Sequence, residues 1–190
     1  MGATIDGADR ADGGEMTSRT PSIACVDVDY REPGAVAACE LFRSWTDERP
    51  AAEVVARIEE VASYVPGRFD RRELPCLLAV LGALDEWPAV VVIDGYVWLG
   101  DEHAPGLGAH LHRALGGQAA VIGVAKTRFH GSRLAREVLR GGSRSPLYVT
   151  AVGMDVAEAA DRIRGMHGPY RIPTLLRRVD HLCRGRAGGA

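Results

Sequence analysis

The order of apolar segments along the chain predicts an α/β layered domain, with helices on both faces of a central sheet. Candidate strands come first and then alternate with candidate helices, which is the order of a layered α/β fold. Two segments, residues 89–94 and 119–125, are almost continuously apolar, as strands buried on both faces are. With 190 residues, 46% of them apolar, the chain can bury one sizeable core. We therefore expect a single domain over residues 21–190.

The first third of that domain is predicted to consist of strands. Residues 22–30 form a strand, and residues 34–42 pair with it as a hairpin, because Glu32-Pro33-Gly34 is typical of a turn. Residues 53–64 contain Glu and Ala, which favour a helix, and β-branched residues, which favour a strand; we expect a strand. The proline and glycine in residues 64–67 then require a turn.

Helices and one further strand complete the prediction. Residues 70–86 form a helix with a leucine face, capped by Asp70, with Glu73 three residues on as in a capping box. Pro75 is tolerated there because it falls in the first turns. The remaining elements are helices at residues 105–115, 155–166 (capped by Asp155) and 174–183, and a strand at residues 146–152.

Composition narrows the class of protein. The four cysteines are scattered without metal-finger spacing, so we expect a reducing, cytoplasmic setting in which Cys25 and Cys76 act as small core residues. No segment approaches the roughly 18 apolar residues that a membrane span needs. Residues 1–20 are rich in Gly and Asp and lack an apolar stretch, which predicts a disordered tail rather than a signal peptide.

Charge is distributed unevenly along the chain. The net charge of −2 argues against a nucleic-acid binder. However, residues 1–125 carry 10 basic and 20 acidic side chains, and residues 126–190 carry 13 basic and 5 acidic ones. A cationic half beside an acidic half fits a track for a phosphate backbone next to a carboxylate metal site. Two solvated helical faces of opposite sign would explain the same pattern equally well.

Three carboxylates stand at the ends or starts of apolar elements, namely Asp27, Glu73 and Asp94. Asp94 with Gly95 ends a central strand, where open α/β sheets place their ligands. Burying a carboxylate is costly unless it is paired or binds a metal, and three from adjacent elements could converge on one Mg²⁺. Taken singly, Asp27 is also explained as a strand end facing water, and Glu73 as part of a capping box.

Other residues near the same predicted edge have two interpretations each. Lys126 ends the second buried strand and is either a snorkelling terminus or a cation aimed at the site of Asp94. Gly95 and Gly123 leave backbone near that site that a flat ligand could approach. Tyr64, on the predicted turn, is a core side chain or a wedge between stacked bases, and physics alone favours the core.

Six short motifs follow one another in a characteristic order and spacing. They are Ile23-Ala24-Cys25-Val26-Asp27-Val28, Tyr64-Val65-Pro66-Gly67 with Arg72-Glu73, Val92-Ile93-Asp94-Gly95, Ile122-Gly123-Val124-Ala125-Lys126, Pro146-Leu147-Tyr148-Val149-Thr150 and Tyr170-Arg171-Ile172-Pro173. Together they resemble the endonuclease V family, over almost everything after residue 20. The resemblance implies a three-layer ribonuclease H-like fold with a mixed central sheet and helices on both faces.

The resemblance also implies an activity and its cofactor. Such enzymes use Mg²⁺, for which Mn²⁺ substitutes, and serve DNA repair by cutting the second phosphodiester bond 3′ to a deaminated base. The implied substrate is DNA or RNA that contains inosine, and we expect a monomer that binds nucleic acid and no membrane. The implied metal ligands are Asp27, Glu73 and Asp94, with Asp180 near the metal, and Lys126 is the implied cation at the scissile phosphate.

The same resemblance implies the nucleic-acid contacts. The turn with Tyr64, Pro66 and Gly67 would be a wedge, and main-chain groups around Gly67, Phe69, Gly95 and Gly123 would recognise the flipped base. The flanking backbone would be gripped by a run of arginines: Arg128, Arg133, Arg136, Arg140 and Arg144.

The segment after Asp94-Gly95 departs from the family pattern. Family members usually have a small residue or His there, then Gly, and a His several residues on; here Tyr96 opens a longer stretch and His103 comes late. Thr127 follows Lys126 where a second lysine is common. Three hypotheses stay open: an inosine-directed endonuclease, a nuclease of the same fold with another target, and a nucleic-acid-binding protein without catalysis. Three mutually repelling carboxylates argue against the last.

Overall fold

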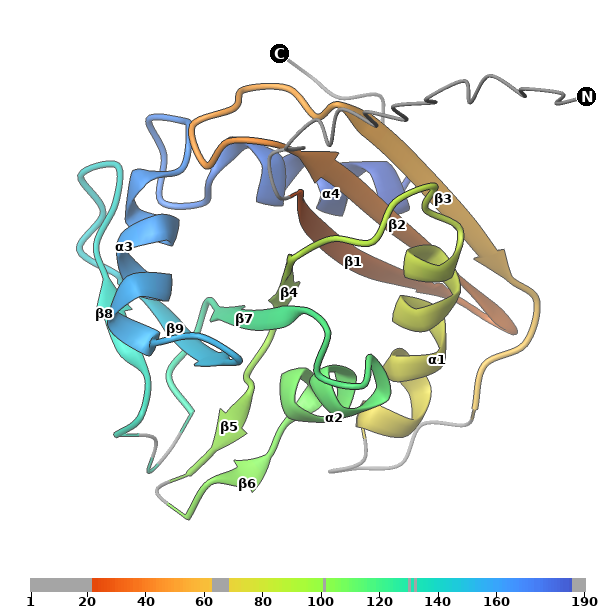
Figure 1. Cartoon of the computed structure of the whole chain (residues 1–190), viewed down its shortest axis with the longest axis horizontal. Coiled ribbons are helices and arrows are strands. Elements are labelled where there is room, and N and C mark those ends of the chain that lie inside the picture. Colours follow the sequence, from red (N-terminus) through yellow and green to blue (C-terminus); the bar gives the residue numbers. More distant parts are fainter. Residues whose placement is uncertain (1–21, 63–68, 101, 130, 132, 186–190) are drawn as a thin grey trace, which may run out of the picture.

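The computed structural model describes residues 22–62, 69–100, 102–129, 131 and 133–185 (Figure 1). A seven-stranded mixed sheet, in the order β3-β2-β1-β4-β7-β9-β8, forms its middle layer. These strands are β1 (Ile23–Arg31), β2 (Gly34–Phe42), β3 (Ala52–Ile58), β4 (Val90–Asp94), β7 (Ala120–Ala125), β8 (Arg136–Val138) and β9 (Leu147–Val152). The predicted tail at residues 1–20 and the predicted turn at residues 64–67 lie outside the described residues.

Strands β1 and β2 form the predicted antiparallel hairpin, in a register that runs from Ile23↔Phe42 to Arg31↔Gly34. Gly34 is required at the turn, because a Cβ there would lie 2.1 Å from the carbonyl oxygen of Ile58 on β3. The third strand is confirmed, but it ends at Ile58 rather than at residue 64. Beyond it the chain leaves the sheet, and the amide of Val61 donates to the carbonyl of Pro33 instead.

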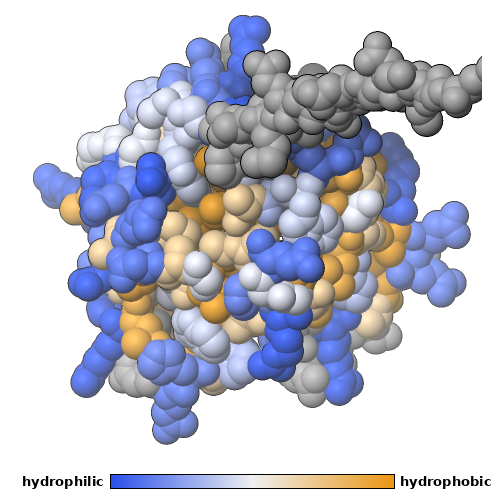
Figure 2. All heavy atoms as spheres, in the orientation of Figure 1, coloured by the Kyte–Doolittle hydropathy of each residue, from blue (hydrophilic) through white to orange (hydrophobic). Residues whose placement is uncertain are grey.

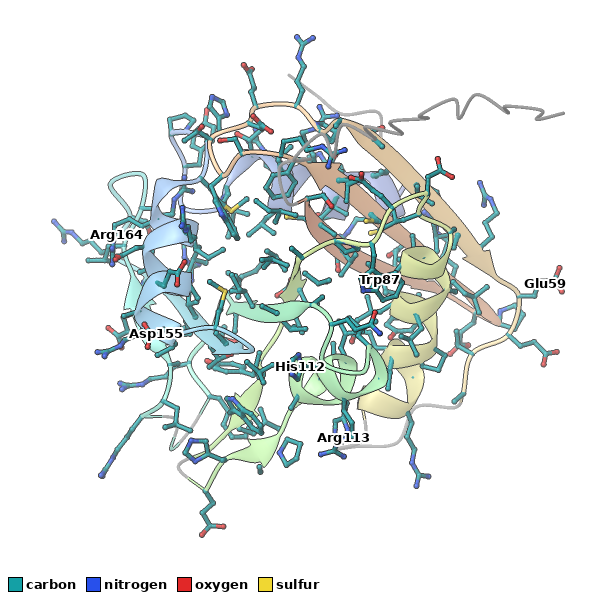
Figure 3. All side chains as sticks on the ribbon, in the orientation of Figure 1. Glu59, Trp87, His112, Arg113, Asp155 and Arg164 are labelled. Carbon is teal, nitrogen blue, oxygen red and sulfur yellow. The ribbon has the colours of Figure 1, made fainter. Side chains whose placement is uncertain are left out.

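Four helices cover the sheet, two on each face, as the fold class predicts (Figure 1). Helices α1 (Phe69–Gly82) and α2 (Leu107–Ala114) pack on one apolar cluster, and α3 (Val156–Gly165) and α4 (Thr174–Cys183) pack on the other. Asp155 caps α3 as predicted, and Figure 3 shows Asp155 and Arg164 at the two ends of that helix. On the face seen in Figure 2, hydrophilic side chains project around the rim and apolar ones gather nearer the middle.

The predicted bounds of two helices were wrong. Helix α1 begins at Phe69, one residue before the predicted cap Asp70, and it ends at Gly82 rather than at residue 86. It ends there because the amide of Leu84 bonds to the carbonyl three residues back, which tightens and closes the last turn. Helix α2 begins two residues later than predicted, because Pro105 belongs to a short strand.

Three strands were missed because they are only two or three residues long. Strands β5 (Trp98–Leu99) and β6 (Ala104–Pro105) pair with each other in a small hairpin, and β8 joins the far edge of the main sheet. Strands this short carry too few residues for an alternating pattern to emerge from the sequence.

The predicted role of Cys25 and Cys76 as small core residues is confirmed. All four cysteines are free and buried, and Cys25 and Cys76 lie in opposite apolar clusters. None of the helices in the described residues is long and apolar enough to cross a membrane.

Arg140 does not have the role that the sequence predicted for it. Its side chain is buried, and its guanidinium donates to five main-chain carbonyls, those of Arg164, Met166, Gly168, Tyr170 and Arg171. A guanidinium with this many acceptors fixes the shape of the loop between α3 and α4. Arg140 is therefore unavailable to grip a nucleic-acid backbone.

A buried ion pair attaches α4 to the hairpin side of the sheet. The Nε of Arg178 donates to the buried Glu40 of β2 at 3.1 Å, and its terminal nitrogen donates to Glu53 of β3 at 2.6 Å. Burial raises the pKa of Glu40 to about 7, against the opposing effect of the Arg178 charge. The folded protein therefore holds a proton on Glu40 at pH values where the unfolded chain has released it.

The first prediction concerns this proton. Because the pKa of Glu40 is raised on folding, the free energy of unfolding should fall as the pH rises from about 4.5 to about 7. The Glu40 contribution should be on the order of 2–3 kcal/mol, fully lost above pH 7. Urea unfolding of wild type and Glu40→Gln in buffer with chelator should show that difference, and the exposed Glu137→Gln should match wild type. Parallel pH profiles for wild type and Glu40→Gln would contradict the prediction.

Candidate metal centre

Three of the predicted site residues meet at one edge of the sheet because their strands are adjacent and parallel. Strand β4 pairs with β1 on one side and β7 on the other, in a register that places Val26 beside Ile93 and Asp94 beside Val124. Asp27 therefore lies level with Asp94, the last residue of β4, and Lys126 follows the end of β7. The residue two positions before each of these three belongs to the apolar cluster under α3 and α4. Side chains two residues apart in a strand point to the same face, so all three point toward the layer of α4.

Glu73 reaches the same edge from the opposite layer. It lies near the start of α1, whose later turns pack on the other face of the sheet. Burial raises its pKa to about 7, and the charges of Asp27 and Asp94 add to the rise. Glu73 is therefore partly buried where it feels the charges of the other two carboxylates, and its part in a capping box with Asp70 stays a prediction.

Asp27 is the most strongly constrained carboxylate of the group. Its Oδ1 accepts a hydrogen bond from the amide of Val28 at 2.9 Å. Its pKa is raised to about 7, mainly by burial and also by the charges of Asp94 and Asp180, although the Val28 bond and the Lys126 charge oppose the rise. Mutual repulsion of buried carboxylates is what an added cation would relieve.

Lys126 is the cation that the protein itself supplies. Its Nζ lies 2.6 Å from Oδ2 of Asp94, and both side chains remain nearly half exposed, at 47% and 41%. Burial lowers the pKa of Lys126, but the hydrogen bond and the charges of Asp94, Asp27 and Asp180 outweigh it, so the pKa is raised. An exposed ion pair of this kind contributes little to stability, which leaves both groups ready to exchange partners.

Lys126 is also the only lysine in the sequence, among 23 basic Lys and Arg residues. The ammonium of lysine is a compact charge, and the guanidinium of arginine cannot take its place with the same geometry. A chain that uses arginine at every other basic position but lysine at this strand end therefore marks the position as special. The sequence itself carries this signal.

Asp180 completes the acidic group from α4. Its Oδ1 lies 2.9 Å from the guanidinium of Arg184, one turn on. Its charge acts on both Asp27 and Lys126, which places it at the same edge. Its part in binding a metal stays a prediction.

An open pocket lies over Asp27, Asp94 and Lys126. It is bounded by the strand ends, by α4 and by the segment that precedes α4. Its lining consists of Val26, Asp27, Ile93, Asp94, Val124, Lys126, Ile172, Leu176 and Val179.

The carboxylates are chemically suited to a hard divalent cation, but they are not arranged as a ready set of metal ligands. Within the part of the chain that the structure describes, no three His, Cys, Asp or Glu side chains form a ready cage for a metal. The physical reason is electrostatic: the carboxylates repel one another, and Asp94 is engaged by Lys126. Carboxylate oxygens are nevertheless the ligands that Mg²⁺ takes, and a bound cation would remove the repulsion that separates them.

The predicted nucleic-acid contacts are only partly covered by the described residues. Tyr64, Pro66 and Gly67 lie outside them, and Phe69 is placed only as the first residue of α1. Arg128 is exposed, 3.9 Å from Glu137, and its contact with a nucleic-acid backbone stays a prediction.

The two glycines near the site have packing reasons of their own. A Cβ on the buried Gly123 would lie 2.6 Å from the carbonyl oxygen of Gly95 and 2.9 Å from Oγ1 of Thr150. Gly95 has φ +149°, which favours glycine, and its amide donates to the carbonyl of Val124. Their proposed contacts with a flipped base stay predictions, because close packing alone accounts for both glycines.

Two side chains that the sequence analysis left without a role hold the backbone around Lys126. The hydroxyl of Tyr96 donates to the carbonyl of Thr127 at 2.9 Å and accepts from the amide of Phe129 at 2.9 Å. The guanidinium of Arg171 donates to the carbonyl of Lys126, and to that of Pro146 at 2.7 Å. Such contacts to main-chain atoms leave no trace in residue patterns, although the unusual Tyr96 was a pointer.

Comparison with known proteins decides the family. The family model described as Endonuclease V matches residues 10–164, more than half of the chain. The chain belongs to the endonuclease V family. The endonuclease V of Rhodospirillum centenum is 33% identical over 183 residues, covering 83% of this chain and 75% of the relative. That of Streptomyces coelicolor is 34% identical over 189 residues, covering 87% and 78%.

Solved endonuclease V structures share the fold. The crystal structure from Streptomyces avermitilis superposes with a TM-score of 0.72 at 31% identity, covering 88% of this chain and 81% of that one. The Ciona intestinalis enzyme bound to DNA containing an inosine has the same TM-score at 19% identity, covering 93% and 89%. The predicted ribonuclease H-like fold is thus confirmed, and the chain, as an endonuclease V, is an endonuclease.

The second prediction follows from the repulsion at the acidic edge of this endonuclease V. Asp27→Asn should keep the hydrogen bond from Val28 while removing a partly buried charge that Asp94 and Asp180 disfavour. Without divalent ions at pH 8, the variant should be more stable than wild type by about 1 kcal/mol, because residues kept for function often lower the stability of the folded protein.

Urea unfolding in chelator measures this difference. Asp29→Asn is the matched control, because it lies on the same face two residues on but is paired with Arg31. It should give no such gain. Equal or lower stability of Asp27→Asn would show that Asp27 is not under repulsion.

Proposed function

We propose that this endonuclease V hydrolyses a phosphodiester bond 3′ to a deaminated base, in DNA or RNA that contains inosine, and that it requires Mg²⁺. The observation that carries the proposal is that Asp27, Glu73 and Asp94, from three elements, lie close enough for their charges to act on one another, and that Asp27, Asp94 and Lys126 line one open pocket. Asp180 stands at the edge of the same group. We further propose a cytoplasmic monomer that serves DNA repair, with Mn²⁺ able to replace Mg²⁺.

The four carboxylates would hold the ion by their oxygens. A divalent ion at this position supplies an activated water and neutralises the charge that develops on the leaving oxygen. Asp94 would be one ligand of the ion, and Lys126, which pairs with Asp94 in this structure, would supply an ammonium beside it. A fixed ammonium there stabilises the charge on a phosphate oxygen as the bond breaks.

Nucleic acid as the substrate is supported by charge and by relatives. Beyond Lys126 the chain is strongly basic, and Arg128 is exposed beside the pocket. The Ciona intestinalis relative was crystallised with DNA that contains an inosine followed by a ribo-adenosine. Phosphate contacts from arginines position a strand, while the base is chosen elsewhere in the site.

A second candidate, a nuclease of the same fold with a different target, is favoured by one observation. The atypical segment after Asp94 folds as the β5–β6 hairpin, and Trp98 attaches it to β9 by donating to the carbonyl of Ala151 at 3.1 Å. His103, at its tip, contacts the Trp98 ring with ring centroids 5.8 Å apart. A fixed hairpin beside Gly95 changes what can approach that side of the pocket.

The third prediction tests the reaction. Labelled DNA and RNA strands, each with a single inosine, should be cut on the 3′ side of the inosine in Mg²⁺ or Mn²⁺, and not in chelator. Asp27→Ala should lower the single-turnover rate at least about a thousandfold, because a metal ligand is lost. Asp29→Ala, on the same strand face, should cut like wild type.

Each alternative has its own outcome in this experiment. Cutting of other structures but of neither inosine strand would favour the second candidate. Binding without cutting, weakening steeply with salt, would favour a non-catalytic binder. Undiminished cutting by Asp27→Ala would refute the metal site.

The fourth prediction tests the ion directly, without activity. Mn²⁺ bound to the protein should be detected by electron paramagnetic resonance, and Mg²⁺ should displace it. Asp94→Asn should weaken Mn²⁺ binding by about tenfold or more, because one charged ligand is lost. Asp161→Asn, an exposed acid on α3, is the control that should leave binding unchanged. Equal Mn²⁺ affinity in both variants would place the ion elsewhere.

A further inference from the structure

The segment from Lys126 to Phe129 carries two groups of the proposed site and has no regular structure of its own. It leaves the sheet at the end of β7, and all four of its residues are exposed. Lys126 must point to Asp94, and the guanidinium of Arg128 lies 3.9 Å from Glu137. An exposed irregular segment keeps such geometry only if other parts of the molecule hold it.

Tyr96 holds this segment from the side of β4. Its hydroxyl makes two bonds at once, accepting from the amide of Phe129 and donating to the carbonyl of Thr127, each at 2.9 Å. These two bonds straddle Arg128. The Tyr96 ring also lies edge-on to the Phe129 ring, with centroids 6.0 Å apart.

The backbone of Tyr96 is itself fixed, so the hydroxyl is delivered from a rigid base. On one side the amide of Gly95 donates to Val124, and on the other the amide of Val97 donates to Oγ1 of Thr150 at 2.9 Å. The Tyr96 carbonyl accepts from the amide of Gly108 at 3.1 Å. Val97 is fully buried beneath it.

Arg171 holds the same segment from the opposite side, by donating to the carbonyl of Lys126. The carbonyls of Lys126 and Thr127 are thus taken by different side chains. Arg171 in turn belongs to the loop that the buried Arg140 shapes. The segment has one attachment from before β7 in the sequence and one from after it.

We propose that Tyr96 is a positioning residue for Lys126. Its hydroxyl acts on Lys126 indirectly, by holding the backbone from Thr127 to Phe129 in place. The inference rests on the proposed function for the role of Lys126, and it concerns a residue at which this chain departs from its family. A phenylalanine could supply the ring but neither bond. The clamp keeps the ammonium on Asp94 until substrate arrives and keeps Arg128 between its two fixed neighbours.

The test removes the hydroxyl alone. In Tyr96→Phe, the single-turnover cleavage rate of an inosine-containing strand should fall about tenfold, while its affinity, measured in Ca²⁺ or chelator, should change less than about twofold. If Tyr96 had only a structural role, Tyr96→Phe would shift the thermal midpoint of unfolding, and the cleavage rate would not fall more than the affinity. Tyr148→Phe is the matched control, a neighbouring tyrosine of β9 that should behave as wild type in both measurements.

Two further readouts do not need activity. Hydrogen exchange at the Phe129 amide should speed up about tenfold in Tyr96→Phe and not in Tyr148→Phe, because only the first loses the acceptor. Since Lys126 is the only lysine, a protein labelled with ¹³C-lysine gives one side-chain signal, and Tyr96→Phe should shift or broaden it.

The outcomes separate the clamp from the proposed function. Unchanged exchange at Phe129, or an unchanged lysine signal, would overturn the clamp whatever the activity. Faster exchange with an unchanged cleavage rate would overturn the positioning role. A wild type that cuts no inosine strand would refute the proposed function, while the exchange and lysine signals would still decide whether Tyr96 holds Lys126.

Discussion

The parallel pairing of β4 with β1 and β7 is the constraint on which the site depends. Because Asp94 stands beside Val124 and Val26 beside Ile93, the ends of three strands come level at one edge. Side chains alternate along each strand, so a slip of one residue in either pairing would send a carboxylate or Lys126 to the opposite face. The apolar clusters on both faces fix that register, since a slip would move residues such as Val92 and Ile122 into the opposite cluster, whose packing they do not match.

The electrostatic cost at this edge is concentrated where chemistry is proposed. Burial and mutual repulsion raise the pKa of both Asp27 and Glu73, while Lys126 pairs with Asp94 and Arg184 pairs with Asp180. The Glu40 pair beneath α4 is different, because Arg178 is shared with Glu53 and fastens a helix. The group around Glu40 therefore holds α4 to the sheet, whereas the acidic edge of the proposed site remains short of positive charge. A shortage of charge in an open pocket is what a divalent ion would complete.

The sequence predicted what periodicity and strand-end chemistry determine. Apolar runs located the strands from Ile23 to Phe42 and both central strands, and carboxylates at their ends indicated a shared site. Contacts made by main-chain atoms were beyond its reach. Arg140 looked like one more surface arginine, yet it is buried among carbonyls, because nothing in the sequence shows which loop will fold around it. Tyr96 and Arg171 escaped for the same reason.

Lys126 shows how these levels combine. Register places it beside Asp94, the surrounding acids raise its pKa, Arg171 holds its carbonyl, and Tyr96 holds the residues that follow it. Each of these would act equally on an arginine, but a guanidinium is larger, planar and spread over three nitrogens, so it would bridge Asp94 rather than cap one oxygen. A compact ammonium contacts a single carboxylate oxygen, so it can exchange that oxygen for one of a phosphate without breaking a two-point contact. The one lysine of an otherwise arginine-only basic set stands where that difference would matter.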